Sequence, residues 1–385
     1  MIPMSPTPVI SHESSPLKGI KVIELGQVLS APFAGSIFAD LGAEVIKIER
    51  SGTGDDARTM GPAFRHGDAL NFHIFNRNKK SIALNLKDPL EVEKLDRLIC
   101  DADILIHNLR PGVTKDLGLD GETLTTKHPR LIYCEISAFG HTGPMSKKPG
   151  YEPLVQAYSG LSSTNGGPND PPTRMGASVC DQGSGMWVVI GALSMLTQRA
   201  ASGRGGIVNT SLLETALAWN GQKNDAYLNL NQLPIKHASG HPSFVPYEAF
   251  DTMDGPILIC CGNDRLFQKL CTLLNKSNWS EDDRFITNRA RLTNKDVLLA
   301  ELIPILKQRS RDEWLRAFEL AGIPCSAILA IPEVVREEQV LALEMFQHVP
   351  GEDFTLTAIP LSFNGQRPQI KTTAPKLGAD NDLLN

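Results

Sequence analysis

The sequence predicts an α/β protein with a doubly wound, Rossmann-like large domain and a smaller α+β domain. Three observations support this fold class: strand and helix patterns alternate up to residue 225, their spacing changes after it, and turn-rich loops appear there. Strands that alternate with helices pair in parallel, because each crossover needs a helix to return the chain. We expect a large domain at 1–225, a small domain at 226–330 and a C-terminal segment, 331–385, that returns to the large domain.

Short apolar runs mark the strands of the large domain. They are expected at residues 20–25, 43–49, 81–86, 103–107, 131–137 and 207–212. Helices are expected at residues 32–41, 88–100 and 181–199, with Asp88 as an N-cap before Pro89. Ligands of such a sheet bind at the carboxyl ends of the strands.

The sequence pattern changes at the start of the small domain. A loop of turn residues, 238–243, precedes a strand at 256–261, and helical patterns follow up to residue 306 and again at 313–320. The final segment is rich in proline and short of helix signals, which suits a chain that packs along the large domain.

Composition excludes several classes of function. The chain has 385 residues, of which 41% are hydrophobic and 21% charged, as in globular proteins. Its net charge of −5 argues against a nucleic-acid partner. The most apolar stretch, 186–196, is about half of the ~20 residues that a bilayer requires, so we expect a buried helix and no membrane partner.

The termini and cysteines indicate a cytoplasmic protein. Residues 1–16 lack the basic start and apolar run of a signal peptide, and we expect a flexible arm there. The seven cysteines are odd in number and form no CxxC pair, which is typical of reduced thiols and argues against disulfides or a zinc site.

Three weak motifs have structural alternatives. Residues 52–57 fit a dinucleotide fingerprint, but they follow the second strand, and two acids would face the pyrophosphate. His237 and His241 have the spacing of helix-borne metal ligands, yet Gly240 and Pro242 favour a loop. The basic run 71–87 would hold phosphates or form a solvated charged edge, and composition favours the edge.

Asp181 begins a predicted helix, and two roles fit it. Spacing alone favours a helix cap, the commonest role of Asp at such a position. The second role uses the same physics, since helix amides would keep the carboxylate ionised near neutral pH. An ionised carboxylate in a dry cleft attacks activated acyl groups.

A series of short motifs resembles the class III CoA-transferases, the CaiB/BaiF-like family of formyl-CoA transferase, succinyl-CoA-dependent dicarboxylate transferases and α-methylacyl-CoA racemases. The resemblance covers residues 17–378. The motifs are Gly19–Leu25, Ala31–Ala34, Leu41–Arg50, Gly54–Arg58, Asn76–Ser81, Asn108–Gly112, Gly150–Glu152, Asp181 with Ser184–Met186, Gly203–Gly205, Val245–Tyr247 and Asp283–Phe285.

The resemblance implies a covalent mechanism and a particular assembly. Asp181 would be the nucleophile that forms aspartyl anhydride and thioester intermediates, with Tyr151, Glu152 and Gly240 as supporting residues. Gly240 lies in a stretch that resembles the flexible loop of the family, which excludes water from the anhydride. The assembly would be an interlocked homodimer, in which each ring-like chain is threaded by the other.

The resemblance also implies that coenzyme A is a substrate, with no permanently bound cofactor and no metal. The CoA-binding residues would be Arg50, Leu84, Lys87, Asn108, Leu109 and Lys148. Two positions depart from formyl-CoA transferase, with Leu29 in place of a catalytically helpful Gln and Asp116 in place of a phosphate-facing Arg.

Tyr151 favours transfer over racemisation. Racemases of this family have His at this position, and a Tyr is a poor base at neutral pH. The alternatives are a racemase-like isomerase and an inactive CoA-binding member. We predict succinyl-CoA as donor and a short dicarboxylate such as glutarate as acceptor. Arg58, Arg65 and Arg174 are candidate partners for the second carboxylate.

Overall fold

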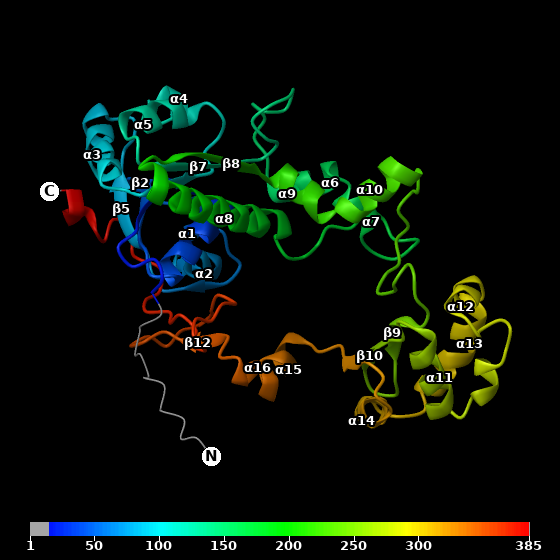
Figure 1. Cartoon of the computed structure of the whole chain (residues 1–385). Coiled ribbons are helices and arrows are strands. Elements are labelled where there is room, and N and C mark those ends of the chain that lie inside the picture. Colours follow the sequence, from blue (N-terminus) through cyan, green and yellow to red (C-terminus); the bar gives the residue numbers. More distant parts are fainter. Residues whose placement is uncertain (1–14, 385) are drawn as a thin grey trace, which may run out of the picture. The chain divides into compact units, whose positions relative to one another are not determined.

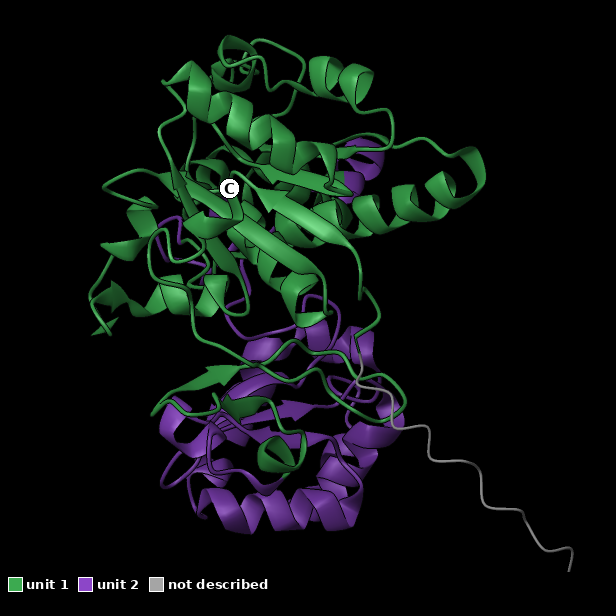
Figure 2. Ribbon diagram, turned by 90° about the vertical axis from the view of Figure 1, so that its left-hand side faces the viewer, with its two compact units in different colours: residues 1–161, 174–224, 339–385 green, residues 162–173, 225–338 purple. Residues whose placement is uncertain are grey.

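The structure is a computed structural model, and it describes residues 15–384. All but the last two residues of the expected N-terminal arm lie outside the described residues. The chain divides into two compact units (Figure 2). Unit 1 comprises residues 1–161, described from residue 15 onward, with 174–224 and 339–385, and unit 2 comprises 162–173 and 225–338. The domain boundaries expected at residues 225 and 330 stay predictions.

Unit 1 contains a six-stranded parallel sheet in the order β5-β2-β1-β6-β7-β8. Its strands are β1 (Lys21–Glu24), β2 (Glu44–Arg50), β5 (Lys80–Leu84), β6 (Ile104–His107), β7 (Ile132–Ser137) and β8 (Gly206–Ser211). Numbered along the chain, these six strands lie in the order 3-2-1-4-5-6, which is that of the Rossmann fold. The predicted α/β fold with a parallel sheet is confirmed.

Helices cover both faces of this sheet (Figure 1). One face carries α1 (Ser30–Asp40) and α8 (Val179–Ser202), and the other carries α3 (Pro89–Cys100) and α5 (Gly121–Lys127). Alternate strand residues serve the two faces, since Val22 packs with α1 and α8 while Ile23 packs with α3. The predicted N-cap of α3 is confirmed, because Asp88 Oδ1 accepts a hydrogen bond of 2.9 Å from the Leu90 amide.

Helix α8 is long and apolar enough, on length and composition alone, to cross a membrane. Its residues Val188 and Ala192 are fully buried in the core cluster that includes the sheet, so it serves as a core helix of unit 1. The helix predicted to be buried at residues 186–196 is buried on one face only, because Met186, Trp187 and Ile190 are exposed.

The C-terminal residues of unit 1 cover the edge strand β5. The amides of Ser81 and Ala83 donate to the side chains of Asp380 and Asn381, both at 2.8 Å. An open strand edge pairs readily with other chains, and these carboxamide and carboxylate groups occupy it. The remaining elements of unit 1 are β3 (Phe64–Arg65), β4 (Asp68–Ala69), α2 (Leu70–Asn76), α4 (Val113–Asp116), α6 (Glu152–Tyr158), α9 (Leu212–Trp219), β12 (Phe346–His348) and β13 (Thr355–Thr357).

Unit 2 is built on a three-stranded antiparallel sheet in the order β11-β10-β9. Its own core contains Trp279, Trp314 and Phe318, all buried. Its elements are β9 (Tyr247–Asp251), β10 (Pro256–Cys260), α11 (Asp264–Leu273), α12 (Asn288–Thr293), α13 (Lys295–Leu306), α14 (Arg311–Ala321), β11 (Cys325–Ala327) and α15 (Ile331–Val334). The chain passes between the units at α7 (Leu161–Thr164), after residue 173, within α10 (Gly221–Leu230) and at α16 (Glu338–Ala342).

Candidate active site

Asp181 lies in the first turn of α8. The helix begins at Val179, two residues earlier than predicted, and Ser178 is its N-cap residue. Asp181 is therefore not the cap, and the structural alternative offered for it is wrong. A carboxylate in the first turn still lies near the positive end of the helix dipole.

A buried Glu–Gln pair on α6 holds the backbone that leads into Asp181. Glu152 Oε1 accepts hydrogen bonds from the Cys180 amide at 2.8 Å and from Gln156 Nε2 at 3.3 Å. Gln156 Oε1 in turn accepts from the Met175 amide at 2.8 Å. Both side chains are almost fully buried, so this frame fixes the first turn of α8 and the loop that precedes it.

The environment raises the pKa of Asp181 to about 7. Burial is the larger cause, because a charged carboxylate loses its hydration, and the negative charge of Glu152 adds to it. The carboxylate that the sequence predicts to be ionised near neutral pH is therefore ionised there only in part. The stabilising effect of the helix N-terminus is smaller than the cost of desolvation and repulsion.

Small residues in the second turn of α8 allow close packing with two other helices. A Cβ atom on Gly183 would lie 2.6 Å from Thr215 of α9, and one on Gly185 would lie 2.8 Å from the Ser30 carbonyl of α1. Ser184 Oγ lies 2.8 Å from Thr215 Oγ1. The turn of α8 that follows Asp181 is therefore packed against the N-terminus of α1.

Five of the six predicted CoA-binding residues lie at or just after the carboxyl ends of neighbouring strands. Arg50 and Leu84 are register partners at the ends of β2 and β5, Lys87 follows β5, and Asn108 and Leu109 follow β6. Arg50 pairs with Asp56 and is exposed, as is Lys87, whereas Leu84 is buried. This is the edge at which parallel sheets bind ligands.

The other predicted site residues lie farther along the chain. Lys148 is exposed in the loop that joins β7 to α6, and Tyr151 is the N-cap residue of α6 with 61% of its surface exposed. Tyr151 thus directly precedes Glu152. Gly240 belongs to unit 2, where its amide donates to the His237 carbonyl at 2.7 Å.

Several charged residues that the sequence offered for phosphates are buried in ion pairs. Arg77 pairs with Asp40, and Lys79 pairs with Glu24 at 2.6 Å. Both interpretations of the basic run, a phosphate site and a solvated edge, are therefore wrong for these two side chains. Both side chains lie just before the edge strand β5, and a buried charge requires a partner of opposite charge.

The motif at residues 52–57 also has an internal role. Asp55 is buried, pairs with Lys47 at 2.9 Å, and accepts hydrogen bonds from the amides of Val28 and Ala57. His237 and His241 lie in a loop, as predicted. Across residues 15–384 no group of three or more His, Cys, Asp or Glu side chains is arranged to hold a metal.

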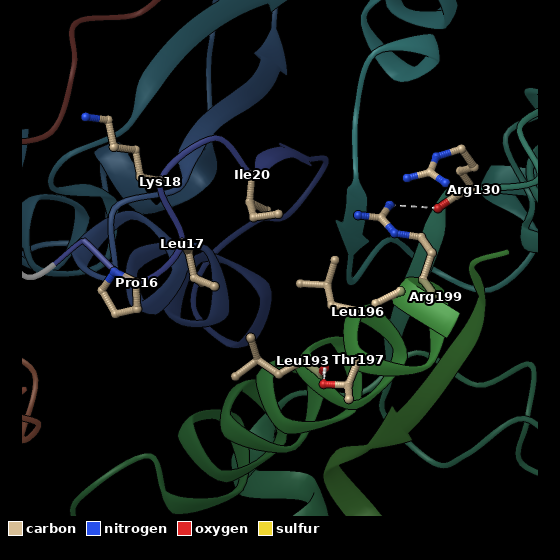
Figure 3. A pocket seen from close by; sticks show the side chains of 10 residues that line it. Pro16, Leu17, Lys18, Ile20, Arg130, Leu193, Leu196, Thr197 and Arg199 are labelled. Atoms are coloured by element: carbon tan, nitrogen blue, oxygen red, sulfur yellow. Dashed lines mark hydrogen bonds between the residues drawn. The ribbon is translucent and has the colours of Figure 1, made fainter. Parts of the chain in front are cut away.

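Unit 1 contains a cavity of about 540 Å³ (Figure 3). It is lined by Leu17, Ile20 and the last turns of α8, where Arg199 donates to the Arg130 carbonyl at 2.9 Å. More than three helical turns separate Asp181 from Leu193, which is about 18 Å along the axis. This cavity therefore does not belong to the candidate site.

Comparison with known proteins identifies the family. The model of CoA-transferase family III matches residues 17–381. The chain is 36% identical to an acetyl-CoA:oxalate CoA-transferase of Acetobacter aceti, over 96% of this chain and 95% of that one. The chain belongs to CoA-transferase family III. It is a CoA-transferase, and its predicted resemblance is confirmed.

Other members of family III agree with this assignment. A succinyl-CoA:glutarate CoA-transferase of Mus musculus is 38% identical, over 85% of this chain and 75% of that one. The structure of a CaiB/BaiF family protein from Brucella suis is 34% identical with a TM-score of 0.88, and the match covers 96% of this chain and 98% of that one. The Brucella suis protein therefore shares the α/β fold of this chain.

Proposed function

We propose that this family III CoA-transferase moves CoA from succinyl-CoA to a short dicarboxylate through covalent intermediates on Asp181. The observation that carries the proposal is the carboxylate of Asp181, half-buried in the first turn of α8, where Glu152 holds the backbone at the preceding Cys180 amide. With a pKa of about 7, a substantial fraction of it is ionised at neutral pH and available as a nucleophile.

The proposed reaction consists of four substitutions at carbonyl carbon. The Asp181 carboxylate attacks the donor thioester, the C–S bond breaks, and an acyl-aspartyl anhydride and CoA thiolate form. The thiolate attacks the aspartyl carbonyl, which releases the donor acid and leaves an aspartyl thioester. The acceptor carboxylate then expels the thiolate to form a second anhydride. Attack of the thiolate on the acceptor carbonyl gives the new acyl-CoA and restores Asp181, with no net proton transfer.

The choice of a dicarboxylate acceptor rests on relatives and on one arginine. Relatives named for succinyl-CoA:glutarate transfer are 36–38% identical to this chain. Of the three candidate arginines, Arg58 is bound to Glu49 and Asp68, and Arg65 to Asp353. Within residues 15–384 the guanidinium of Arg174 has no hydrogen bond or ion pair, and the Gln156 frame anchors its neighbour Met175. We therefore propose that Arg174 binds the second carboxylate.

The proposal includes a homodimer, in agreement with an exposed apolar surface on unit 1. Met186, Trp187 and Ile190 of α8 lie on it with Leu217 and Trp219 of α9, all exposed. The rings of Trp187 and Trp219 lie 6.2 Å apart between centroids. A contiguous apolar surface of this kind is typical of a protein interface. We propose that a second copy of the chain covers it. A cytoplasmic location also stays a prediction.

An exchange assay tests the reaction. The protein is mixed with succinyl-CoA and a panel of free acids that includes glutarate, oxalate and monocarboxylates, and new acyl-CoA species are measured by mass spectrometry. We expect glutaryl-CoA with the native chain and none with Asp181→Ala. Oxalyl-CoA as the main product would show that oxalate, as in the name of the Acetobacter relative, is the acceptor. Exchange by Asp181→Ala at the native rate would rule out Asp181 as the nucleophile.

A trapping experiment tests the intermediate itself. Hydroxylamine added during turnover should convert Asp181 to a hydroxamate, which peptide mapping locates. An unmodified Asp181 under conditions of active exchange contradicts the covalent mechanism. Deuterium incorporated from solvent next to the thioester, without exchange of acids, would instead support the racemase-like alternative.

A further inference from the structure

The segment that joins β1 to α1 has a backbone conformation that its sequence does not favour. Val28 has φ of 63°, in the left-handed region that a β-branched side chain rarely adopts. Such a residue persists only where its surroundings impose the conformation, and such residues cluster at binding and catalytic sites. The segment follows the carboxyl end of β1, at the point where the strand order of the sheet reverses between β1 and β6.

Two side chains hold consecutive amides of this segment from opposite sides. Asn108 Oδ1 accepts a hydrogen bond of 2.8 Å from the Gln27 amide, and Asp55 Oδ1 accepts one of 3.0 Å from the Val28 amide. Asp55 follows β2 and Asn108 follows β6, and these strands are the two neighbours of β1. The strand order itself therefore places one acceptor on each side of the segment.

Asn108 makes two more bonds to the same segment. Its Nδ2 donates to the Gln27 carbonyl at 2.8 Å and to Ser30 Oγ at 3.0 Å. The amide side chain therefore has a partner in the segment for both its oxygen and its nitrogen. The resemblance to the family implies that Asn108 binds CoA. In the structure its side chain instead forms hydrogen bonds within the protein.

Buried lysines complete the arrangement. Lys47 pairs with Asp55 at 2.9 Å and donates to the Gly26 carbonyl at 2.8 Å, while Lys79 donates to the Pro32 carbonyl at 2.8 Å. Burial alone would raise the pKa of Asp55, but the charge of Lys47 and the bonds from Lys47 and two backbone amides hold it below its ordinary value. Asp55 therefore stays ionised, and accepts hydrogen bonds as an anion, near neutral pH.

The held segment contacts the helix that carries the nucleophile. The Ser30 carbonyl lies 2.8 Å from the position of a Cβ on Gly185, one turn after Asp181 on α8. The segment 26–30 thus follows the strand edge at which we place CoA and contacts the turn of α8 that follows Asp181. A shift of this segment would change both the edge proposed to bind CoA and the position of Asp181 on α8.

We propose that Asp55 and Asn108 are positioning residues that clamp Gln27 and Val28 and so shape the acyl-CoA site at the β1–β6 switch point. This inference rests on the proposed function only in that CoA binds at this edge of the sheet. Neither residue needs to touch CoA through its side chain. Their effect passes through the backbone of the clamped segment.

The test separates positioning from general stability by rescue. Asn108→Ala and Asp55→Ala should each weaken the binding of CoA, measured by isothermal titration calorimetry, by about tenfold or more, and raise KM for succinyl-CoA more than they lower kcat. Adding Val28→Gly should restore most of the affinity, because glycine adopts the left-handed conformation without a clamp.

A matched control uses the same kind of bond elsewhere. Asp120 accepts from the Thr123 amide at the N-terminus of α5, so Asp120→Ala removes a carboxylate–amide bond and should leave CoA affinity unchanged. Where an alanine variant does not fold, Asn108→Asp replaces it, since it keeps the acceptor but loses both donors. Folded clamp variants with native affinity, or a loss that Val28→Gly does not restore, would overturn the inference.

The measurement is independent of the nucleophile. CoA binding requires no turnover, so it can be repeated on Asp181→Ala and gives the same answer if Asp181 proves not to be the nucleophile. An affinity for CoA that survives every clamp variant, together with normal trapping at Asp181, would instead reject the clamp and leave the proposed function standing.

Discussion

The chemistry proposed for Asp181 depends on the balance between its burial and the charge of Glu152. Only the ionised carboxylate attacks a thioester, and burial together with Glu152 raises its pKa to about 7. We therefore expect kcat/KM to fall as the pH is lowered through 7, because the fraction of Asp181 that is ionised decreases. A pH profile of succinyl-CoA turnover measures this acid limb.

Removing the charge of Glu152 should move that limb in a defined direction. Glu152→Gln keeps an acceptor oxygen for the Cys180 amide but removes the repulsion, so the pKa of Asp181 decreases and the limb shifts to lower pH. The decrease in the pKa of Asp181 should be smaller than the elevation that burial still causes in the variant, because burial is the larger cause. A limb that moves to higher pH would contradict the electrostatic account.

Arg174 offers a prediction about acceptor choice. A charge-assisted bond to the second carboxylate contributes about 1.5–3 kcal/mol, so Arg174→Gln should raise KM for glutarate by about tenfold or more. Turnover of a monocarboxylate should change little, and this comparison is the internal control. Equal losses for both classes of acid would show that Arg174 acts on the fold or on CoA instead.

At the scale of elements, the packing of α8 against α1 decides where Asp181 lies. Gly185→Ala would place a methyl group 2.8 Å from the Ser30 carbonyl, and the helices would have to separate. We expect a loss of about 1–3 kcal/mol in the free energy of unfolding, with a raised KM for succinyl-CoA. Denaturant unfolding measures the first quantity.

Glycine at the start of α10 provides the matched control for this substitution. Gly221 is helical, and a Cβ there would have no atom within 4 Å. Gly221→Ala should therefore leave stability the same or slightly higher, since alanine is the better helix former. Equal losses at both positions would mean that the contact with Ser30 is not the cause.

At the scale of the whole molecule, the apolar surface of α8 and α9 predicts association. Light scattering after size-exclusion chromatography should give the mass of two chains for the native protein. Trp187→Glu should lower the mass to one chain, because it places a charge among Met186, Ile190 and Trp219. Leu320→Glu on α14 of unit 2, where 90% of the side chain is exposed, should leave the mass unchanged.

The sequence by itself determined the order along the chain of the strands in the large sheet and indicated the family. Apolar runs such as Ile132–Ser137 are long and periodic enough to predict each strand of this sheet, and the Asp88-Pro89 pair predicts the start of α3, because these signals are local. Alternation of strands and helices then leaves few topologies other than a parallel sheet. The motifs that indicate the family are recognisable for the same reason, since each is a short contiguous string.

Only the tertiary structure decided the electrostatics and the clamp. The protonation of Asp181 depends on Glu152, and the conformation of Val28 depends on Asp55 and Asn108, which lie 27 and 80 residues away along the chain. Arg77 and Lys79 likewise look like surface charges until Asp40 and Glu24 are placed beside them. Desolvation and charge pairing are set by neighbours in space, and no local pattern in a single sequence records which residues those neighbours are.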